Sequence, residues 1–513
     1  MRNKKKYGQY FTTGSVADFM VSLISKPKNS DILEPSCGEG VFLNSLQKNS
    51  FSNIHAYEID STLNNSFSYV RYESFVSSPV SEKFDVVIGN PPYIRWKNLE
   101  PDLKEELQHN SLWQKYFNSL CDYLFIFVLK SIEQLREEGE LIFITPEYWL
   151  NTTHSASLRN YMCQNGFFND IYHFKEVPLF EEVASSYIIF KYTKSRNRRQ
   201  PINLYRYSKK SKPQHEELIS LSCFEKISIP QFSSDSRWLL TDSKMQQQIR
   251  TFERKCMKTH GDNPSELSKI GDICDIGNGM VSGLDKAFRI DTDTNTWTAQ
   301  EKRSIIQVLK AKDLDAYSPK GDSRYIFIPS RLSKEEFDTG YPHIKKILDP
   351  FKERLQERYD YNREVPYWEF VFLRNKQLFD KPESKIFIPC KERISHKKYF
   401  RFCLAKETFY PLQDVTAIYK KQHCKENLQY ILAYLNNTRV FDWLIYNGII
   451  KGDIVEFSEA PIANIPFRPI DWENENEVRI HDTISNEVEL YMKDRAKEHI
   501  DIINRQFNIL FND

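Results

Sequence analysis

The feature that most constrains the fold is a run of short apolar segments separated by amphipathic, helix-like segments in the first 190 residues. Three of the apolar segments, Asp31–Ser36, Ile54–Asp60 and Phe84–Gly89, predict strands. A further strand, Leu141–Thr145, follows a predicted helix, Asp122–Glu138, that Gly139 ends. Strands that alternate with helices form parallel sheets covered on both faces. We therefore predict an α/β fold built on a doubly wound, mostly parallel sheet.

The predicted sheet ends with two strands, Asp170–Phe174 and Ser186–Tyr192, that follow one another without an obvious helix. We expect these two strands to be antiparallel. Polar, serine-rich sequence at Ser228–Ser236 then indicates a domain boundary. We predict three parts, which are residues 1–235, 236–475 and a helical segment 476–513.

Composition narrows the class of protein further. The 513 residues include 71 Lys and Arg against 70 Asp and Glu, so the net charge is +1. This composition is typical of a globular protein, and the length suits two to four domains. The nine cysteines contain no C-x-x-C pair, and the eleven histidines show no metal spacing. No apolar run approaches the ~18 residues of a membrane span. We expect a cytoplasmic, reduced protein without a metal and without a membrane partner.

The sharpest motif is Asn90-Pro91-Pro92-Tyr93, directly after the strand that ends at Gly89. This motif suits methylation of a planar exocyclic amine, whose lone pair is delocalised and therefore poorly nucleophilic. The side-chain oxygen of Asn90 and the carbonyl of Pro91 can both accept hydrogen bonds from such an NH₂ group. Proline stiffens the turn and offers no competing N–H, and Tyr93 offers a ring face to an extruded base.

A second motif, Glu34–Leu43 (EPSCGEGVFL), reads as a strand that enters a glycine turn before a helix. Gly38 and Gly40 let the backbone approach a ligand closely. Glu58 ends the next strand, twenty residues after Gly38, a spacing that suits a carboxylate bound to two ribose hydroxyls. The segment lacks the G-x-G-x-x-G pattern and a P-loop lysine, which disfavours dinucleotide and NTP binding.

These motifs occur together in a known order. YGQYFTT (Tyr7–Thr13), EPSCGEG, YEID (Tyr57–Asp60) and NPPY resemble the γ class of N6-adenine DNA methyltransferases, the TaqI type. The resemblance covers about the first 190 residues well and continues more weakly to about residue 470. It implies a Rossmann-like methyltransferase fold, S-adenosylmethionine as cofactor, and double-stranded DNA whose target adenine is flipped out of the helix.

The resemblance also implies roles for individual residues. Thr12, Glu34, Ser36 and Gly38 would surround the methionine part of the cofactor, and Glu58 and Ile59 would flank its ribose and adenine.

The family's next motif, which contacts the cofactor's adenine, has Asp-Phe. This chain has Ser74-Phe75, preceded by Glu73, so Ser74 or Glu73 is the candidate to replace the aspartate. On the substrate side, the implied catalytic residues are Asn90, Pro91, Pro92 and Tyr93, with Phe180 on the second face of the flipped base.

The C-terminal half resembles the family's target-recognition domain, which Ile270–Phe288 would open. The stretch Lys381–Arg401 holds seven Lys and Arg and two Glu, a local net charge of +5 that suits phosphate contacts. We expect a monomer within a restriction-modification or phage-defence system, with a companion restriction endonuclease that forms no stable complex with it.

Three alternatives stay open at the sequence level. NPPY-type motifs also occur in methyltransferases of RNA bases and of protein glutamine, although the long C-terminal half favours DNA. A DNA-binding specificity module with an inactive methyltransferase half is the second alternative, which the altered Asp-Phe motif favours and the intact NPPY disfavours. The third is a fused restriction–modification enzyme, for which no convincing nuclease cluster is visible.

Overall fold

The computed structural model describes residues 12–512 except positions 64, 65, 80, 176, 178, 181–185, 198, 199, 235, 236, 261, 262, 329–331, 359–362 and 452. Residues 7–11 of the YGQYFTT motif therefore lie outside the described residues. The chain divides into two compact units, Met1–Gln246 and Gln247–Asp513, and the boundary falls within helix α9 (Ser243–Lys255).

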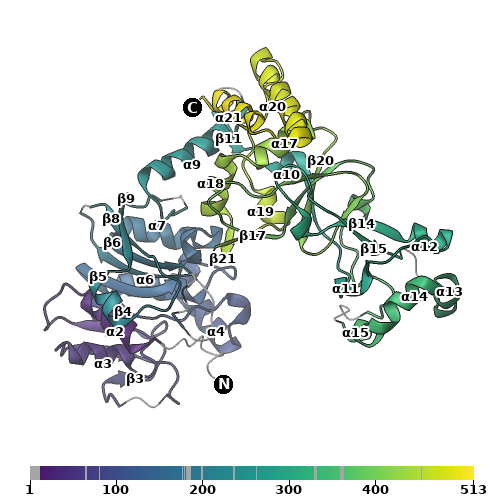
Figure 1. Ribbon diagram of the computed structural model, residues 1–513. Coiled ribbons are helices and arrows are strands. Elements are labelled where there is room, and N and C mark those ends of the chain that lie inside the picture. The colour runs from purple at the N-terminus through teal and green to yellow at the C-terminus, as the bar shows by residue number, and fades with distance from the viewer. Residues whose placement is uncertain are drawn as a thin grey trace. The chain divides into compact units, whose positions relative to one another are not determined.

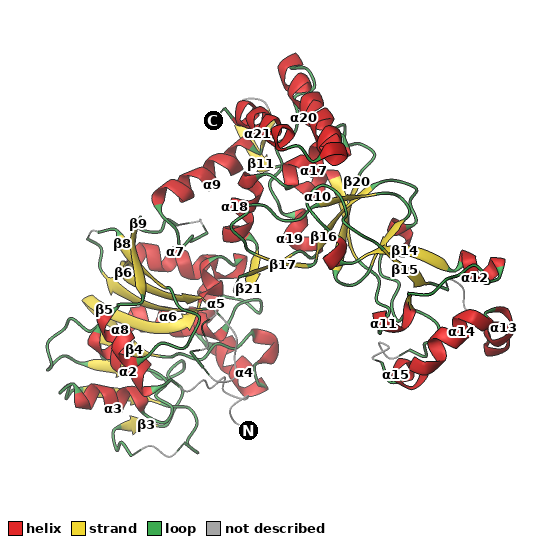
Figure 2. Cartoon of the chain, viewed as in Figure 1, coloured by secondary structure: helices red, strands yellow, loops and turns green. Residues whose placement is uncertain are grey.

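The first unit is built on one large sheet (Figures 1 and 2). Among the described residues nine strands pair in the order β3-β2-β1-β4-β5-β7-β6-β8-β9. Their bounds are β1 Ile32–Glu34, β2 Ile54–Tyr57, β3 Val70–Arg71, β4 Phe84–Gly89, β5 Leu135–Pro146, β6 Gly166–Lys175, β7 Tyr187–Lys194, β8 Ile202–Tyr207 and β9 Phe224–Ile229.

The pairing is parallel except at β7 and β9, which run antiparallel to their neighbours. The predicted antiparallel pair, β6 with β7, is confirmed. The order of the sheet reverses at β1, which pairs with β2 on one side and with β4 on the other. Ligands of such sheets bind outside the carboxyl ends of the strands at this reversal.

Helices cover both faces of the sheet. They are α2 Gly14–Ser22, α3 Val41–Lys48, α4 Pro101–His109, α5 Ser111–Tyr116, α6 Tyr123–Gln134, α7 Ala156–Asn165 and α8 His215–Ser220. Successive strand residues point to opposite faces, so Ile32 joins the core formed with α2 and α3, and Leu33 joins the core formed with α6. The predicted doubly wound α/β fold is confirmed.

The long helix differs from the prediction at its end. We expected a helix over Asp122–Glu138, but α6 ends at Gln134 and Leu135 already pairs with Phe84 as part of β5. Arg136 explains the early end, because its guanidinium binds Asp31 at 2.8 Å and Asp85 at 2.7 Å. These partners are distant in sequence, so the helical periodicity of the segment carries no sign of them.

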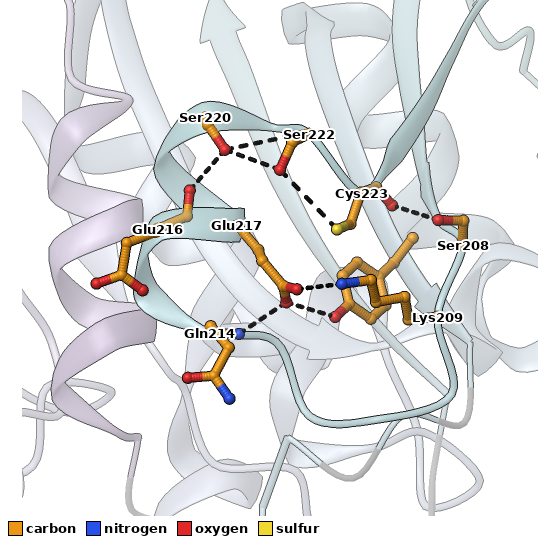
Figure 3. Close-up of polar contacts among 9 residues, drawn as sticks. Ser208, Lys209, Gln214, Glu216, Glu217, Ser220, Ser222 and Cys223 are labelled. Carbon is orange, nitrogen blue, oxygen red and sulfur yellow. Dashed lines mark hydrogen bonds and ion pairs between the residues drawn. The ribbon is translucent and has the colours of Figure 1, made fainter.

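Strands β8 and β9, which the sequence did not predict, are joined through α8 (Figure 3). The carboxylate of Glu217 accepts hydrogen bonds from the Tyr207 hydroxyl and the Gln214 N–H, each at 3.0 Å, and it also pairs with Lys209. The Lys209 contact and the Gln214 amide lower the pKa of Glu217 to about 2. These contacts tie the connection between β8 and β9 together locally.

The second unit is a mixed α+β structure, as predicted, with small sheets instead of one large one. Among its described residues the strands form sheets in the orders β12-β20-β16-β18, β13-β15-β14-β19, β17-β22-β21 and β10-β11. Their bounds are β10 Met257–His260, β11 Asn263–Leu267, β12 Cys274–Asn278, β13 Arg289–Ile290, β14 Ile305–Leu309, β15 Ser323–Ile326, β16 Lys385–Pro389, β17 Lys391–Arg393, β18 Cys403–Ala405, β19 Phe409–Pro411, β20 Val415–Lys420, β21 Ile449–Lys451 and β22 Ile454–Glu456.

The helices of the second unit surround these sheets. They are α10 Ile270–Ile273, α11 Asp285–Phe288, α12 Ala299–Arg303, α13 Lys334–Gly340, α14 Pro342–Leu348, α15 Lys352–Gln356, α16 Lys376–Phe379, α17 Leu428–Leu435, α18 Thr438–Asn447, α19 Glu459–Ala463, α20 Glu475–Asp494 and α21 Lys497–Phe511. The predicted closing helical segment is a pair, α20 and α21, which pack against each other.

No described helix combines the length and the apolarity that crossing a bilayer requires. No group of three or more His, Cys, Asp or Glu side chains in the described part of the chain is arranged to hold a metal ion. All nine cysteines are free thiols.

Candidate functional site

The candidate site lies at the carboxyl ends of β1, β2 and β4, where the strand order reverses. Glu34 is the last residue of β1, Glu58 follows β2, and Asn90 follows β4. A Cβ atom at Gly89 would lie 3.6 Å from the Cγ of Glu34, so the ends of β1 and β4 are in contact. The three motifs found in the sequence therefore meet at one edge of the sheet.

The glycine turn after β1 is tightly built. Gly38 and Gly40 have φ values of 53° and 83°, which L-residues with side chains adopt only with strain. A Cβ atom at Gly40 would also lie 2.7 Å from the ring of Phe67. The Cys37 N–H donates to the carbonyl of Tyr57 at 2.9 Å, which ties the turn to the end of β2.

Glu58 connects the glycine turn to the second strand. Its carboxylate accepts hydrogen bonds from the Gly38 N–H at 2.7 Å and from the Asp60 N–H at 2.9 Å. The pKa of Glu58 is raised overall, because burial raises it by more than these two amide hydrogen bonds lower it. Each carboxylate oxygen accepts one backbone bond and can accept another, so the group suits the hydroxyls of a ribose.

Glu34 is a deeply buried acidic residue of the site. Its side chain is 1% exposed, and its Oε2 atom has no hydrogen-bond partner among the described residues. Burial, and then the neighbouring Glu58, raise the pKa of Glu34 well above its usual range. An unpaired buried carboxylate is costly. A ligand with a cationic end would satisfy it, so the pair of glutamates fits a cofactor with a charged amino-acid end and a ribose.

The NPPY turn is joined to both of the other segments. The Ser36 hydroxyl donates to the backbone carbonyl of Asn90 at 3.3 Å, and the Asn90 Nδ2 donates to the Thr12 hydroxyl at 3.2 Å. Of these two contacts, only the one to Thr12 engages the side-chain amide of Asn90, through its nitrogen. Binding of an amine needs the amide oxygen, so the orientation agrees with the predicted chemistry. Pro91 is buried, and Pro92 and Tyr93 are half-buried.

The aromatic residues of the site form a chain around one residue that the sequence did not single out. The ring of Tyr187, the first residue of β7, lies 6.2 Å from the ring of Tyr93 and 4.8 Å from that of Phe180. Phe180 itself is 6% exposed and packs in the core on the α2–α3 side. The one sequence signal that pointed to Tyr187 was its position at the start of a strand.

Ser74 and Phe75 lie in the turn after β3. Phe75 packs edge-on against Tyr57, with ring centroids 5.7 Å apart. The Ser74 hydroxyl donates to the carboxylate of Glu106, a residue of α4 that sequence reasoning missed. No local pattern links the two residues, because 32 positions separate them. Ile59 is half-buried and packs against the same core.

A buried lysine holds the turn that contains Phe75. The Lys130 ammonium donates to the carbonyls of Val76 at 3.0 Å and Ser78 at 2.6 Å, and also to that of Phe75. Burial lowers the pKa of Lys130 to about 8. Three carbonyl acceptors compensate for the loss of water around this charge.

A histidine–carboxylate pair extends the same edge beyond β4. Glu147 directly follows β5, and its N–H donates to the Ser186 carbonyl at 3.0 Å. Its Oε2 atom lies 2.7 Å from the Nε2 of His173 in β6. Burial acts to raise the pKa of Glu147, but the charge and hydrogen bond of His173, together with Ser186 and Lys175, lower it below its usual value. The pair has no local sequence signal, because Glu147 follows β5 and His173 lies in β6.

Comparison with known proteins shows which family the chain resembles. Residues 28–180 match the Eco57I restriction-modification methylase family. The type II methyltransferase M.HindII of Haemophilus influenzae is 45% identical over 99% of this chain and 96% of its own length, and M.HincII of the same species is 43% identical over the same shares. The type IIL restriction-modification enzyme MmeI, solved in complex with DNA, has a similar fold, with a TM-score of 0.58 at 11% identity over 97% of this chain and 72% of MmeI.

The fold and the site define a methyltransferase built on a doubly wound sheet. The chain belongs to the family of type II restriction-modification methyltransferases. The NPPY turn and the glycine turn of the candidate site both lie in the segment that matches the Eco57I methylase family.

Proposed function

We propose that this chain is a γ-class, TaqI-type DNA methyltransferase that methylates the N6 amine of an adenine flipped out of double-stranded DNA. The observation that carries the proposal is the linkage of Asn90 to Thr12 and Ser36. Through it the residue suited to bind an amine and the turn suited to bind the cofactor become one site. The family membership supports a role in restriction-modification.

The proposed cofactor is S-adenosylmethionine. Thr12, Glu34, Ser36 and Gly38 would hold its methionine part. Glu58 with Ile59 would hold the ribose, and Ser74 with Phe75 the adenine. The buried, unpartnered oxygen of Glu34 supports a cationic ligand group there. When bound, this cofactor supplies an electrophilic methyl group on a sulfonium, which is a good leaving group without a metal.

The protein's own contribution is to position the target amine. The Asn90 side-chain oxygen and the Pro91 carbonyl accept its two N–H groups, which concentrates the nitrogen lone pair. Tyr93 and Phe180, with Tyr187 between them, supply aromatic surface for the flipped base. Extrusion of a base costs a few kcal/mol of stacking, which aromatic contacts offset. The proton released from N6 passes to solvent.

We assign a separate role to each of three consecutive parts of the chain. Residues 1–235 bind the cofactor and catalyse transfer, residues 236–475 recognise the DNA target, and residues 476–513 form a helical end. We propose a cytoplasmic monomer, in line with nine free thiols, that works beside a companion restriction endonuclease without a stable complex.

The proposal is tested with purified protein, unmethylated genomic DNA and isotopically labelled S-adenosylmethionine. The DNA is digested to nucleosides and analysed by mass spectrometry. Labelled N6-methyladenine is the expected product. Labelled N4-methylcytosine would keep the mechanism and overturn the target base. Absence of label in DNA together with calorimetric cofactor binding would overturn the DNA substrate in favour of RNA or protein.

A further inference from the structure

The fold of the second unit separates the cations of the basic stretch Lys381–Arg401 into two groups, those bonded within the unit and those exposed to solvent. The Lys385 side chain is 0% exposed, and its ammonium donates to the carbonyls of Phe379 at 3.2 Å and Glu407 at 3.0 Å. The Arg401 guanidinium donates to the carbonyls of Ala311 and Leu314. These two cations support the interior of the unit and are not available to a partner.

The alternation of strand β17 separates charges of opposite sign. Lys391 and Arg393 are exposed, and Glu392 between them points to the other side of the strand. There its carboxylate accepts the Arg401 Nε–H at 2.5 Å and the Arg401 N–H at 3.3 Å. The one acidic residue of this strand is thus neutralised away from the two exposed cations.

The turn that follows adds two more cations to the exposed side. Lys397 and Lys398 are both exposed, and Lys398 has a φ of 55°. The turn is anchored after Lys398 by Phe400, which is 1% exposed and packs on Phe441 and Phe457. The Ile394 N–H donates to the Asp453 carbonyl at 2.6 Å and anchors the other end.

We propose that Lys391, Arg393, Lys397 and Lys398 form a basic face that binds the phosphate backbone of duplex DNA without reading its sequence. This inference rests on the proposed function. Four exposed cations within eight residues, on a strand and turn fixed at both ends, match the spaced negative charges of a phosphodiester strand. Acidic side chains border the face at Asp453, whose carboxylate is 3.9 Å from Arg393, and at Glu456, opposite Lys391 in the ladder. Among the ion pairs of the described residues none involves Lys397 or Lys398, although the carboxylate of Asp442 lies close enough to Lys398 to interact with its charge.

The number of phosphate contacts can be measured from the salt dependence of DNA binding. Each neutralised phosphate releases counterions, and the logarithm of the binding constant falls with the logarithm of the salt concentration by about 0.9 per contact. Loss of all four cations therefore lowers the magnitude of this slope by about 3 to 4, and weakens binding at moderate salt by about tenfold or more.

The experiment compares the full chain with the variant K391Q/R393Q/K397Q/K398Q. Binding to a fluorescein-labelled duplex of arbitrary sequence is followed by anisotropy over a salt series, and thermal unfolding checks that the variant folds. A charge-matched control variant replaces four exposed lysines scattered over the second unit, namely K302Q/K334Q/K425Q/K493Q. The expected result is a reduced slope and affinity for the first variant, and values close to wild type for the control.

Each other outcome has a separate meaning. An unchanged slope in the folded first variant overturns the basic face. An equal loss in the control overturns it as well, because the loss would then reflect net charge alone. Stronger binding of wild type to polyglutamate than to the duplex would reassign the face to an acidic protein partner. If the quadruple variant does not fold, K397Q/K398Q alone must lower the slope by about 2. Failure of the proposed function is a separate result, seen when wild type produces no labelled N6-methyladenine in DNA, whereas failure of the basic face is seen in the salt slope.

Discussion

The carboxyl edge of the first unit and the basic stretch of the second unit teach different lessons about short sequence signals. At the edge, motifs separated by dozens of residues come together because parallel strands deliver their ends to one place. In the basic stretch, neighbours in sequence separate, since Lys385 and Arg401 turn inward and Lys397 and Lys398 stay outside. Sheet topology determines where a motif at a strand end lies. In a run of charged residues, by contrast, the burial of each side chain determines what that residue can do.

The largest expected effect comes from substitution of the proposed catalytic residue at this edge. Asn90→Ala removes the proposed amine acceptor, and we expect methylation to fall by about 100-fold or more, as for other single groups that act in the transition state. Cofactor affinity, measured by calorimetry, is expected to stay near that of wild type. The exposed Asn53 provides a matched control, as Asn53→Ala. Retained methylation, or a loss of cofactor binding large enough to explain the lost methylation, would contradict the role given to Asn90.

Glu34→Gln tests whether the buried carboxylate exists for a cationic ligand. Loss of a charge-assisted bond predicts a cofactor affinity about tenfold to a hundredfold lower. Because the folded pKa of Glu34 is raised, its ionisation costs stability as the pH rises above the usual value of 4.5. The ligand-free variant should therefore lose less stability than wild type between low and neutral pH. Calorimetry and urea unfolding over a pH series measure both effects, and unchanged affinity would contradict the assignment.

Gly40→Ala tests the geometry of the turn. The left-handed φ of 83° costs an alanine about 1–2 kcal/mol, and its Cβ would meet the Phe67 ring at 2.7 Å. We expect lower stability in urea and weaker cofactor binding. Gly14→Ala is the matched control, because a Cβ there meets no atom within 4 Å and alanine favours the helix α2. Equal destabilisation by both changes would remove the argument for a special turn.

The smallest effect concerns the altered motif after β3. Ser74→Ala removes the hydroxyl that is bound to Glu106 and is proposed to contact the cofactor's adenine. Loss of one neutral hydrogen bond to the adenine predicts a cofactor affinity a few-fold lower. Glu73→Gln changes an exposed side chain and is expected to leave affinity unchanged. Calorimetric titration distinguishes the two. The opposite ranking would make Glu73 the replacement for the family's aspartate.

Sequence reasoning located the parts of the site that depend on one strand each. Glu34, Glu58 and Asn90 follow strands whose apolar runs are visible, so their meeting followed from the parallel order. Tyr187 and Glu106 escaped notice, because each acts through a partner on another element. The same reason explains the early end of α6, where Arg136 binds two distant carboxylates. Local patterns predict where a strand or helix lies, and long-range polar partners decide where it stops.

The reversed direction of β7 has a consequence for how such a protein can diverge. β1, β2 and β4 bring their last residues to the site edge, but β7 brings its first residue, Tyr187, to the same edge. In the proposed function, the aromatic contacts to the base therefore depend on the start of β7, and the acidic contacts to the cofactor depend on the ends of β1 and β2. Substitutions near Tyr187 can then change which base is accepted while the methyl donor stays the same.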